Sequence, residues 1–130
     1  MKYIFCSLLF ILSTLLSFSQ TTTVTCSEFK TGDFAYLDSS TNIIWRIKRT
    51  AKHQTEKNDK EGIVIKKKIK WLSPCEYQLT QTWTNSKQLR KGNFKSLTYT
   101  IISTAGDSYR YSCKCSDGRK IAGTVVKMPG

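Results

Sequence analysis

Apolar and polar residues alternate along most of the chain, and no window of about 11 residues keeps the helical period. Such alternation is typical of strands that bury one face. It predicts eight strands, at residues 33–38, 43–50, 53–58, 62–72, 75–84, 94–103, 107–115 and 119–128. Turn residues separate these segments, and every connection is short enough for a hairpin.

A series of hairpins predicts an all-β fold, an up-and-down antiparallel meander. Eight strands in this order close naturally into a small barrel, because closure removes the exposed sheet edges. An open or sandwich-like sheet is the alternative that the same pattern allows.

The first residues depart from the alternation, because residues 3–16 form an apolar run after Lys2. The run is shorter than the ~20 residues that span a bilayer. Ser17 and Ser19 place small residues at −3 and −1 of a cleavage site. We therefore predict a signal peptide at residues 1–19, a single β-barrel-like domain at 20–130, and export to the periplasm or the medium. No membrane span is expected after cleavage; an uncleaved anchor, or lipid attachment at Cys26, is the alternative.

Four cysteines remain after cleavage: Cys26, Cys75, Cys113 and Cys115. In an exported chain they indicate disulfides, with three connectivities open. Cys26 precedes the first strand and Cys75 begins the fifth, so we predict a Cys26–Cys75 bridge between these element ends. Cys113 and Cys115 share one face of one strand, too far apart for an easy bridge, and are expected to stay thiols. Without a CxxC pair, and with His53 as the single histidine, neither a metal nor a cofactor is predicted.

The predicted strand 62–72 has two different faces. One carries Ile63, Ile65, Lys67, Ile69 and Trp71, and we expect it to point inward. The other presents a row of positive charge, Lys66, Lys68 and Lys70. This row could contact a polyanion, or it could be a solvated face that prevents aggregation.

Lys67 is unusual because an inward ammonium needs a carboxylate, a wet interior or a route to solvent. Glu56 lies in the neighbouring strand, and Arg49 and Gln54 lie on either side of the preceding tight turn. We predict that these four residues form a polar cluster at one end of the barrel. The cluster either orients a ligand in a cavity or forms a structural ion-pair network.

Inward aromatic residues complete the candidate ligand-binding set. It comprises Arg49, Gln54, Glu56, Lys67, Trp71, Tyr109 and Tyr111. The aromatic rings could line a pocket, although in a small barrel such rings often only fill the core.

Net charge and the absence of catalytic motifs limit the classes of function that the sequence supports. Removing Lys2 leaves 20 basic and 9 acidic residues, a net charge of +11. This charge suits a surface that meets anions, or one that is simply kept soluble. Catalysis finds no support, because His53 is isolated, the acids are unpaired and no glycine-rich phosphate loop is present. No specific nucleic-acid partner is expected.

Three segments carry a resemblance: Phe29–Phe34, Arg49 with Gln54-Thr55-Glu56, and Ile69–Tyr77, whose Trp71-x-x-x-Cys75-Glu76-Tyr77 motif is the most specific. In these segments the chain resembles small exported proteins of Bacteroidetes-type bacteria that are lipocalin-like in layout and have no established activity. The resemblance implies a lipocalin-like barrel. Some of these proteins carry a DNA topoisomerase IV label, which so short a chain does not support.

Together these observations predict a non-enzymatic, exported module that binds an unknown small molecule in an interior cavity. The alternative is a basic surface-interaction protein that binds anionic envelope polymers and has a packed interior. The volume of the interior distinguishes the two.

Overall fold

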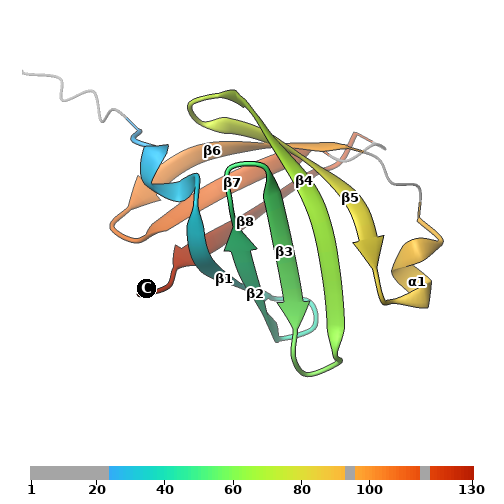
Figure 1. Cartoon of the computed structure of the whole chain (residues 1–130). Coiled ribbons are helices and arrows are strands. Elements are labelled where there is room, and N and C mark those ends of the chain that lie inside the picture. Colours follow the sequence, from blue (N-terminus) through green and yellow to red (C-terminus); the bar gives the residue numbers. More distant parts are fainter. Residues whose placement is uncertain (1–23, 93–95, 115–117) are drawn as a thin grey trace, which may run out of the picture.

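Eight antiparallel strands follow one another around a closed barrel in the computed structural model (Figure 1). The structure describes residues 24–92, 96–114 and 118–130, so the predicted signal peptide and Cys115 lie outside the described residues. The strands are β1 (Gly32–Asp38), β2 (Ile43–Arg49), β3 (His53–Asn58), β4 (Ile63–Ser73), β5 (Glu76–Thr84), β6 (Leu97–Ala105), β7 (Ser108–Lys114) and β8 (Lys120–Lys127). The predicted up-and-down barrel is confirmed, and an open or sandwich-like sheet is not formed.

Two short helices accompany the strands. The 3₁₀ helix η1 (Ser27–Phe29) lies before β1, and α1 (Lys87–Arg90) follows β5. The Ser86 hydroxyl caps α1 by accepting a 3.3 Å hydrogen bond from the Leu89 amide. Both helices were missed, because one turn is too short to show a helical period. Neither helix has the length or apolar content to cross a membrane.

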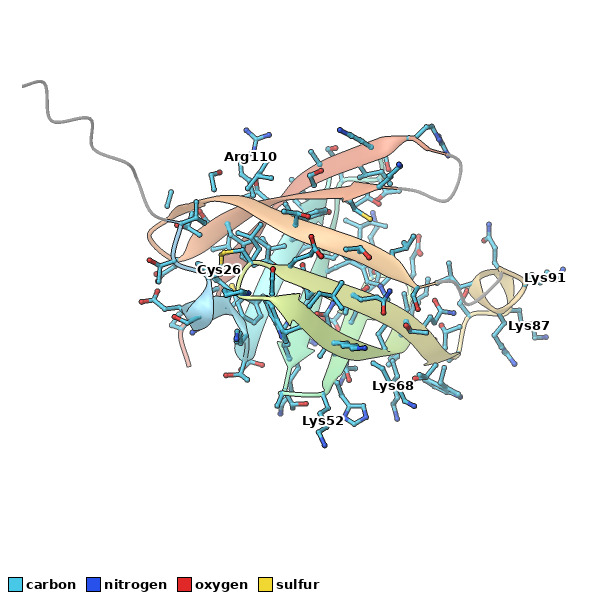
Figure 2. All side chains as sticks on the ribbon, turned by 90° about the horizontal axis from the view of Figure 1, so that it is seen from above. Cys26, Lys52, Lys68, Lys87, Lys91 and Arg110 are labelled. Atoms are coloured by element: carbon cyan, nitrogen blue, oxygen red, sulfur yellow. A yellow bond between two sulfur atoms is a disulfide. The ribbon has the colours of Figure 1, made fainter. Side chains whose placement is uncertain are left out.

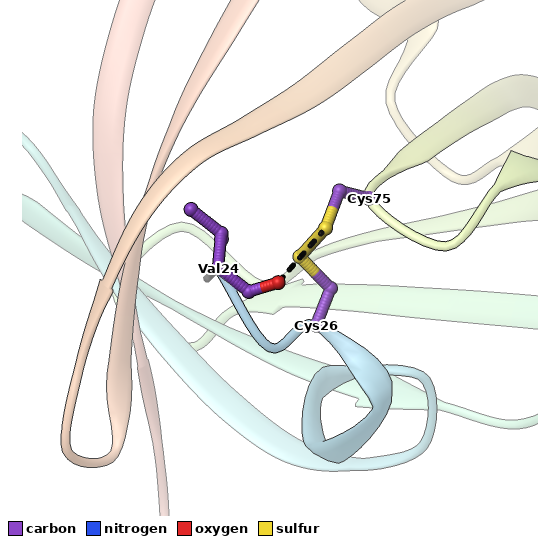
Figure 3. The surroundings of a disulfide bond; sticks show 3 residues. All are labelled: Val24, Cys26 and Cys75. Atoms are coloured by element: carbon purple, nitrogen blue, oxygen red, sulfur yellow. Dashed lines mark hydrogen bonds between the residues drawn. A yellow bond between two sulfur atoms is a disulfide. The ribbon is translucent and has the colours of Figure 1, made fainter. Parts of the chain in front are cut away.

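One end of the barrel is closed by η1. Phe29 is 1% exposed, and its ring packs edge-on against Tyr109, with 5.0 Å between the centroids. The predicted disulfide between Cys26 and Cys75 is formed, and it fastens this helix to the start of β5 (Figure 3). The Lys127 ammonium donates a 2.7 Å hydrogen bond to the Glu28 carbonyl, so the end of β8 meets the same helix.

The core follows the inward positions of the strands. The fully buried residues that meet there are Phe29, Phe34, Ile47, Ile69, Tyr77, Leu79, Ile101, Tyr109 and Val125. On β4, Ile65 and Ile69 are buried, whereas Lys66, Lys68 and Lys70 are exposed, as the alternation predicts.

The closure between β1 and β8 is much shorter than the other strand contacts. β1 pairs with β2 along its whole length, but with β8 only through Phe34↔Lys127 and Ala35↔Val126. Beyond Ala35 the two strands diverge (Figure 1). This divergence opens the barrel wall at the end opposite η1.

Candidate functional site

The predicted polar cluster is formed, and the strand register explains why. Gln54 is the Cα partner of Arg49 on one side and of Lys67 on the other. Glu56 lies two residues further along β3, on the same inward face. The four side chains are linked in sequence: Arg49 Nε donates to Gln54 Oε1 at 2.7 Å, Gln54 Nε2 to Glu56 Oε1 at 2.7 Å, and Lys67 Nζ to Glu56 Oε1 at 2.8 Å.

Arg49 is the most buried cation of this cluster, at 3% exposure. Nη1 donates a 2.7 Å hydrogen bond to the Phe29 carbonyl, and Nη2 donates a 3.1 Å bond to the Tyr109 hydroxyl. The guanidinium also lies 4.9 Å from the Phe34 ring centroid and 4.8 Å from that of Tyr77. These donors and rings stabilise the charge and join the cluster to η1, which is a structural role.

An interior cavity of about 60 Å³ lies beside the cluster. Its lining contains Arg49, Gln54, Glu56, Lys67, Tyr109 and Tyr111 from the predicted set, together with Tyr36, Ile47, Tyr77, Leu79, Tyr99 and Val125. The volume has room for a few water molecules but is well below the ~300–1,000 Å³ of ligand pockets. The interior is therefore nearly filled, with polar and apolar side chains around the small space that remains.

The tyrosines around this cavity fall into two groups. The Tyr77 and Tyr109 hydroxyls lie 3.0 Å apart and bond to each other. The Tyr36, Tyr99 and Tyr111 hydroxyls make no hydrogen bond to any residue in the described ranges. Since a phenol in such surroundings normally finds a partner, these three are free to bond water or a ligand.

Burial keeps these phenols neutral. Removal from water raises the pKa of Tyr36, Tyr99 and Tyr111 above the ordinary value for tyrosine, and it also raises the pKa of Tyr77. At physiological pH each hydroxyl can therefore both donate and accept a hydrogen bond.

A larger cleft of about 920 Å³ occupies the opening between β1 and β8. It is lined by Ala35, Tyr36, Leu37, Asp38, Ser39, Ser40 and Ile44 on one side, and by Tyr111, Ile121, Ala122, Gly123, Thr124 and Val126 on the other. Leu37, Ile44 and Ile121 are at least half exposed, at 56%, 62% and 50%. Tyr36 and Tyr111 also line the interior cavity, so their rings lie where the cleft meets the interior.

Gly123 shapes this boundary. It is the Cα partner of Tyr111, and a Cβ atom at this position would lie 2.6 Å from the Tyr111 hydroxyl oxygen. Only glycine lets the phenol lie directly against the β8 backbone. A glycine inside a strand often marks such a close approach, so Gly123 is the sequence signal for this boundary.

Trp71 is the one predicted ligand-binding residue that the structure does not bring to the cavity. β3 pairs with β4 only as far as Lys68, so Trp71 lies beyond the end of β3. Its ring packs against Tyr77 at 4.9 Å, and the Lys30 ammonium lies 5.5 Å from its centroid. Trp71 lies on the inward face of β4, as predicted. However, β4 extends past the end of β3, and this places Trp71 beside η1 and not at the cavity. The cavity residues that the sequence did not assign to the site are Tyr36, Ile47, Tyr77, Leu79, Tyr99 and Val125.

The predicted lysine row lies on the outer wall, with no contact to the cavity. Lys66, Lys68 and Lys70 alternate with the inward residues of β4 and are all exposed. Figure 2 shows Lys68 and Lys52 pointing away from the barrel on one side and Arg110 on the opposite side.

No protein-family model and no curated protein matches the chain. Among solved structures it is similar to a de novo designed fluorescence-activating β-barrel. The two are 19% identical, the match covers 82% of this chain and 100% of that one, and the TM-score is 0.43. Membership of the exported lipocalin-like group of Bacteroidetes-type bacteria therefore stays a prediction.

Proposed function

We propose that this protein is a non-enzymatic barrel that binds a small, mainly apolar molecule in the cleft between β1 and β8. A polar group of that molecule would bond to the Tyr36 and Tyr111 hydroxyls. The observation that carries the proposal is the position of these two phenols, which have no hydrogen-bond partner among the described residues and line both the cleft and the cavity.

The cleft suits such a ligand better than the interior does. About 60 Å³ is too small for most metabolites, whereas about 920 Å³ falls within the range of ligand sites. Much of the cleft wall is apolar, with Leu37, Ile44, Ile121 and Val126 left substantially exposed, and its polar residues are Asp38, Ser39, Ser40 and Thr124. Exposed apolar groups gathered in one concave place favour an apolar occupant.

The polar groups around the two phenols favour a ligand with an uncharged acceptor group. Arg49 and Lys67 contribute two positive charges, and Glu56 with Asp38 of the cleft contributes two negative charges, so the charges balance. A carbonyl or ether oxygen at the polar end of the ligand could accept hydrogen bonds from the Tyr36 and Tyr111 hydroxyls. Three of the five N–H donors of Arg49 already bond to Gln54, the Phe29 carbonyl and Tyr109, so we expect Arg49 to act on a ligand mainly through its charge.

Export of the mature protein is part of the proposal. The Cys26–Cys75 disulfide is typical of proteins in oxidising compartments. With the proposed signal peptide at residues 1–19, the protein would act in the periplasm or the medium.

The test is binding of 8-anilinonaphthalene-1-sulfonate, which combines apolar rings with an anionic group. The proposal predicts saturable binding of one dye per protein, with enhanced fluorescence, at a salt concentration that screens the outer lysines. Organic extracts of protein purified from its own host, analysed by mass spectrometry, should contain a compound that displaces the dye. Absence of saturable dye binding would contradict the proposal.

A further inference from the structure

The outer wall formed by β2, β3 and β4 is strongly basic. Its exposed cations are Arg46, Lys48, Lys57, Lys66, Lys68 and Lys70, with Lys52 and Lys60 in the adjoining turns. No outward position of β3 or β4 is acidic. Three carboxylates lie nearby: Asp59 is ion-paired with Arg46 at 2.6 Å, Glu61 lies in the same turn, and Asp33 is the Cα partner of Lys48. We call the face of Lys48, Lys57, Lys66, Lys68 and Lys70 the lysine face.

The charge is concentrated on this side of the barrel. On the opposite wall, most central outward positions of β6, β7 and β8 are uncharged, namely Thr100, Ser112, Ala122 and Thr124, and the exception is Arg110, the Cα partner of Thr124. The cations there, Arg110, Lys114 and Lys120 with Arg119 directly before β8, are fewer. Charges that only keep a protein soluble can be spread evenly over its surface. They do not require more cations on one wall of the barrel than on the other.

An exposed tryptophan borders the lysine face. Trp83 is 48% exposed and is the Cα partner of Lys66, whose ammonium lies 5.2 Å from the ring centroid. A register shift between Lys66 and Lys67 sets the pairing here, with Trp83 outward and the next residue, Thr84, buried. β-Bulges commonly re-aim a side chain in this way. A large apolar ring held in solvent beside cations is a feature of binding surfaces.

From this arrangement we infer that the lysine face binds an acidic polysaccharide, with the lysines on its carboxylate or sulfate groups and Trp83 against a sugar ring. Successive outward lysines of β4 lie about 6.6 Å apart, so they present separate point charges rather than one dense site. Lysine ammoniums suit single, spaced acidic groups of this kind.

The same features distinguish a polysaccharide from a nucleic acid. Phosphate recognition favours guanidinium groups, and the guanidinium on this wall, Arg46, is held by both oxygens of Asp59. Single-stranded nucleic acids also need a series of aromatic rings on which successive bases stack. Among the described outward residues of β2–β5, Trp83 is the one exposed Trp, Tyr or Phe, and the His53 imidazole is the other exposed ring.

Affinity for polygalacturonate, measured at fixed ionic strength, tests the inference. The triple variant Lys66→Gln/Lys68→Gln/Lys70→Gln should bind about tenfold or more weakly. The matched control, Arg110→Gln/Lys114→Gln/Lys120→Gln, removes the same charge from the opposite wall and should change the affinity little. Trp83→Ala should weaken binding at both low and high salt, because a ring contact is not screened. Thermal unfolding of each variant checks that the fold is kept.

Three results would overturn the inference. The first is an absence of binding to polygalacturonate. The second is equal weakening by both triple variants, which would mean that net charge alone attracts the polymer. The third is tighter binding of single-stranded DNA than of polygalacturonate, if the Lys66→Gln/Lys68→Gln/Lys70→Gln variant weakens DNA binding to the same degree. That result would mean that the partner is a nucleic acid. Because the dye-binding cleft is elsewhere, these outcomes are independent of the proposed small-molecule function.

Discussion

The Lys67 ammonium lies 2.8 Å from Glu56 Oε1, and the same oxygen accepts a 2.7 Å hydrogen bond from Gln54 Nε2. The side chains of Lys67 and Glu56 are only 16% and 7% exposed. A carboxylate taken this far from water depends on its donors, so the ion pair holds β3 and β4 in a single arrangement. Lysine at an inward position is therefore compatible with the barrel because its partner is also inside.

Replacing Lys67 with Met should destabilise the protein by about 1–3 kcal/mol, less than the ~3–5 kcal/mol of a fully buried pair because Lys67 is partly exposed. The loss arises because Glu56 keeps its charge with one donor fewer. Adding Glu56→Gln should restore most of the stability, since the stranded charge is then removed. Denaturant unfolding of the two single variants and the double variant measures the coupling.

The exposed pair Arg46–Asp59 provides the control, because its side chains are 62% and 64% exposed. Arg46→Met should leave the free energy of unfolding within experimental error. A similarly small effect for Lys67→Met would mean that its ammonium reaches water and that Glu56 does not need it.

The disulfide should contribute strongly to stability, because it closes a loop across a sequence separation of 49 residues. The double variant Cys26→Ala/Cys75→Ala should be less stable by about 4 kcal/mol in the chain-entropy account. The loss of η1 from the barrel end should also free Arg49, since the Phe29 carbonyl accepts one of its hydrogen bonds. Thermal unfolding with and without reductant checks this, and an unchanged midpoint on reduction would contradict it.

The buried tyrosines predict a loss of stability at high pH. Burial raises the pKa of Tyr36, Tyr77 and Tyr99, whereas phenols of the unfolded chain titrate near ~10. Their contribution to stability is complete below pH ~10. Above that value the unfolded chain binds fewer protons than the folded one, so the free energy of unfolding falls.

Ultraviolet absorbance of phenolate and circular dichroism, followed together during alkaline titration, test this expectation. Phenolate from these residues should appear together with loss of the sheet signal. Full ionisation near pH ~10 with the sheet intact would show that the phenols are open to solvent.

Gly123→Ala should disturb the boundary between cleft and cavity. The new methyl group would overlap the Tyr111 phenol, so the ring must move, at a cost of about 1–3 kcal/mol. Dye binding should weaken together with stability. Gly92→Ala is the control, because a Cβ there would meet only the Leu89 carbonyl oxygen at 3.5 Å. Equal behaviour of the two variants would argue against a role for Tyr111 at this boundary.

The sequence predicted the parts of this molecule that depend on period and on neighbouring strands. Alternation along β4 placed Lys67 inside, and the short turns on either side of β3 brought Arg49, Gln54 and Glu56 to it. Both inferences use contacts between strands adjacent in the chain, whose register a hairpin fixes. The position of Cys26 and Cys75 at element ends was enough to pair them.

The cleft could not be predicted in the same way. It arises where β1 meets β8, the two strands furthest apart in sequence, and no turn sets the register between them. Their divergence beyond Ala35 makes Tyr36 and Tyr111 neighbours of an opening instead of core residues. The predicted place of Trp71 at the cavity was wrong for a different reason. Alternation along a strand gives the face on which a side chain lies, but it does not tell where the neighbouring strand ends.

Dye binding and thermal unfolding, measured together on two variants, test the central claim that the free phenols at the cleft bind a ligand. Tyr36→Phe/Tyr111→Phe removes hydroxyls that have no partner in the described structure, so the unfolding midpoint should hardly change. Tyr109→Phe removes the hydroxyl that bonds Arg49 and Tyr77, so it should lower the midpoint.

Affinity for 8-anilinonaphthalene-1-sulfonate should fall about tenfold in Tyr36→Phe/Tyr111→Phe and should stay close to that of the original protein in Tyr109→Phe. Unchanged affinity in the first variant, with its fold intact, would contradict ligand binding by these two phenols.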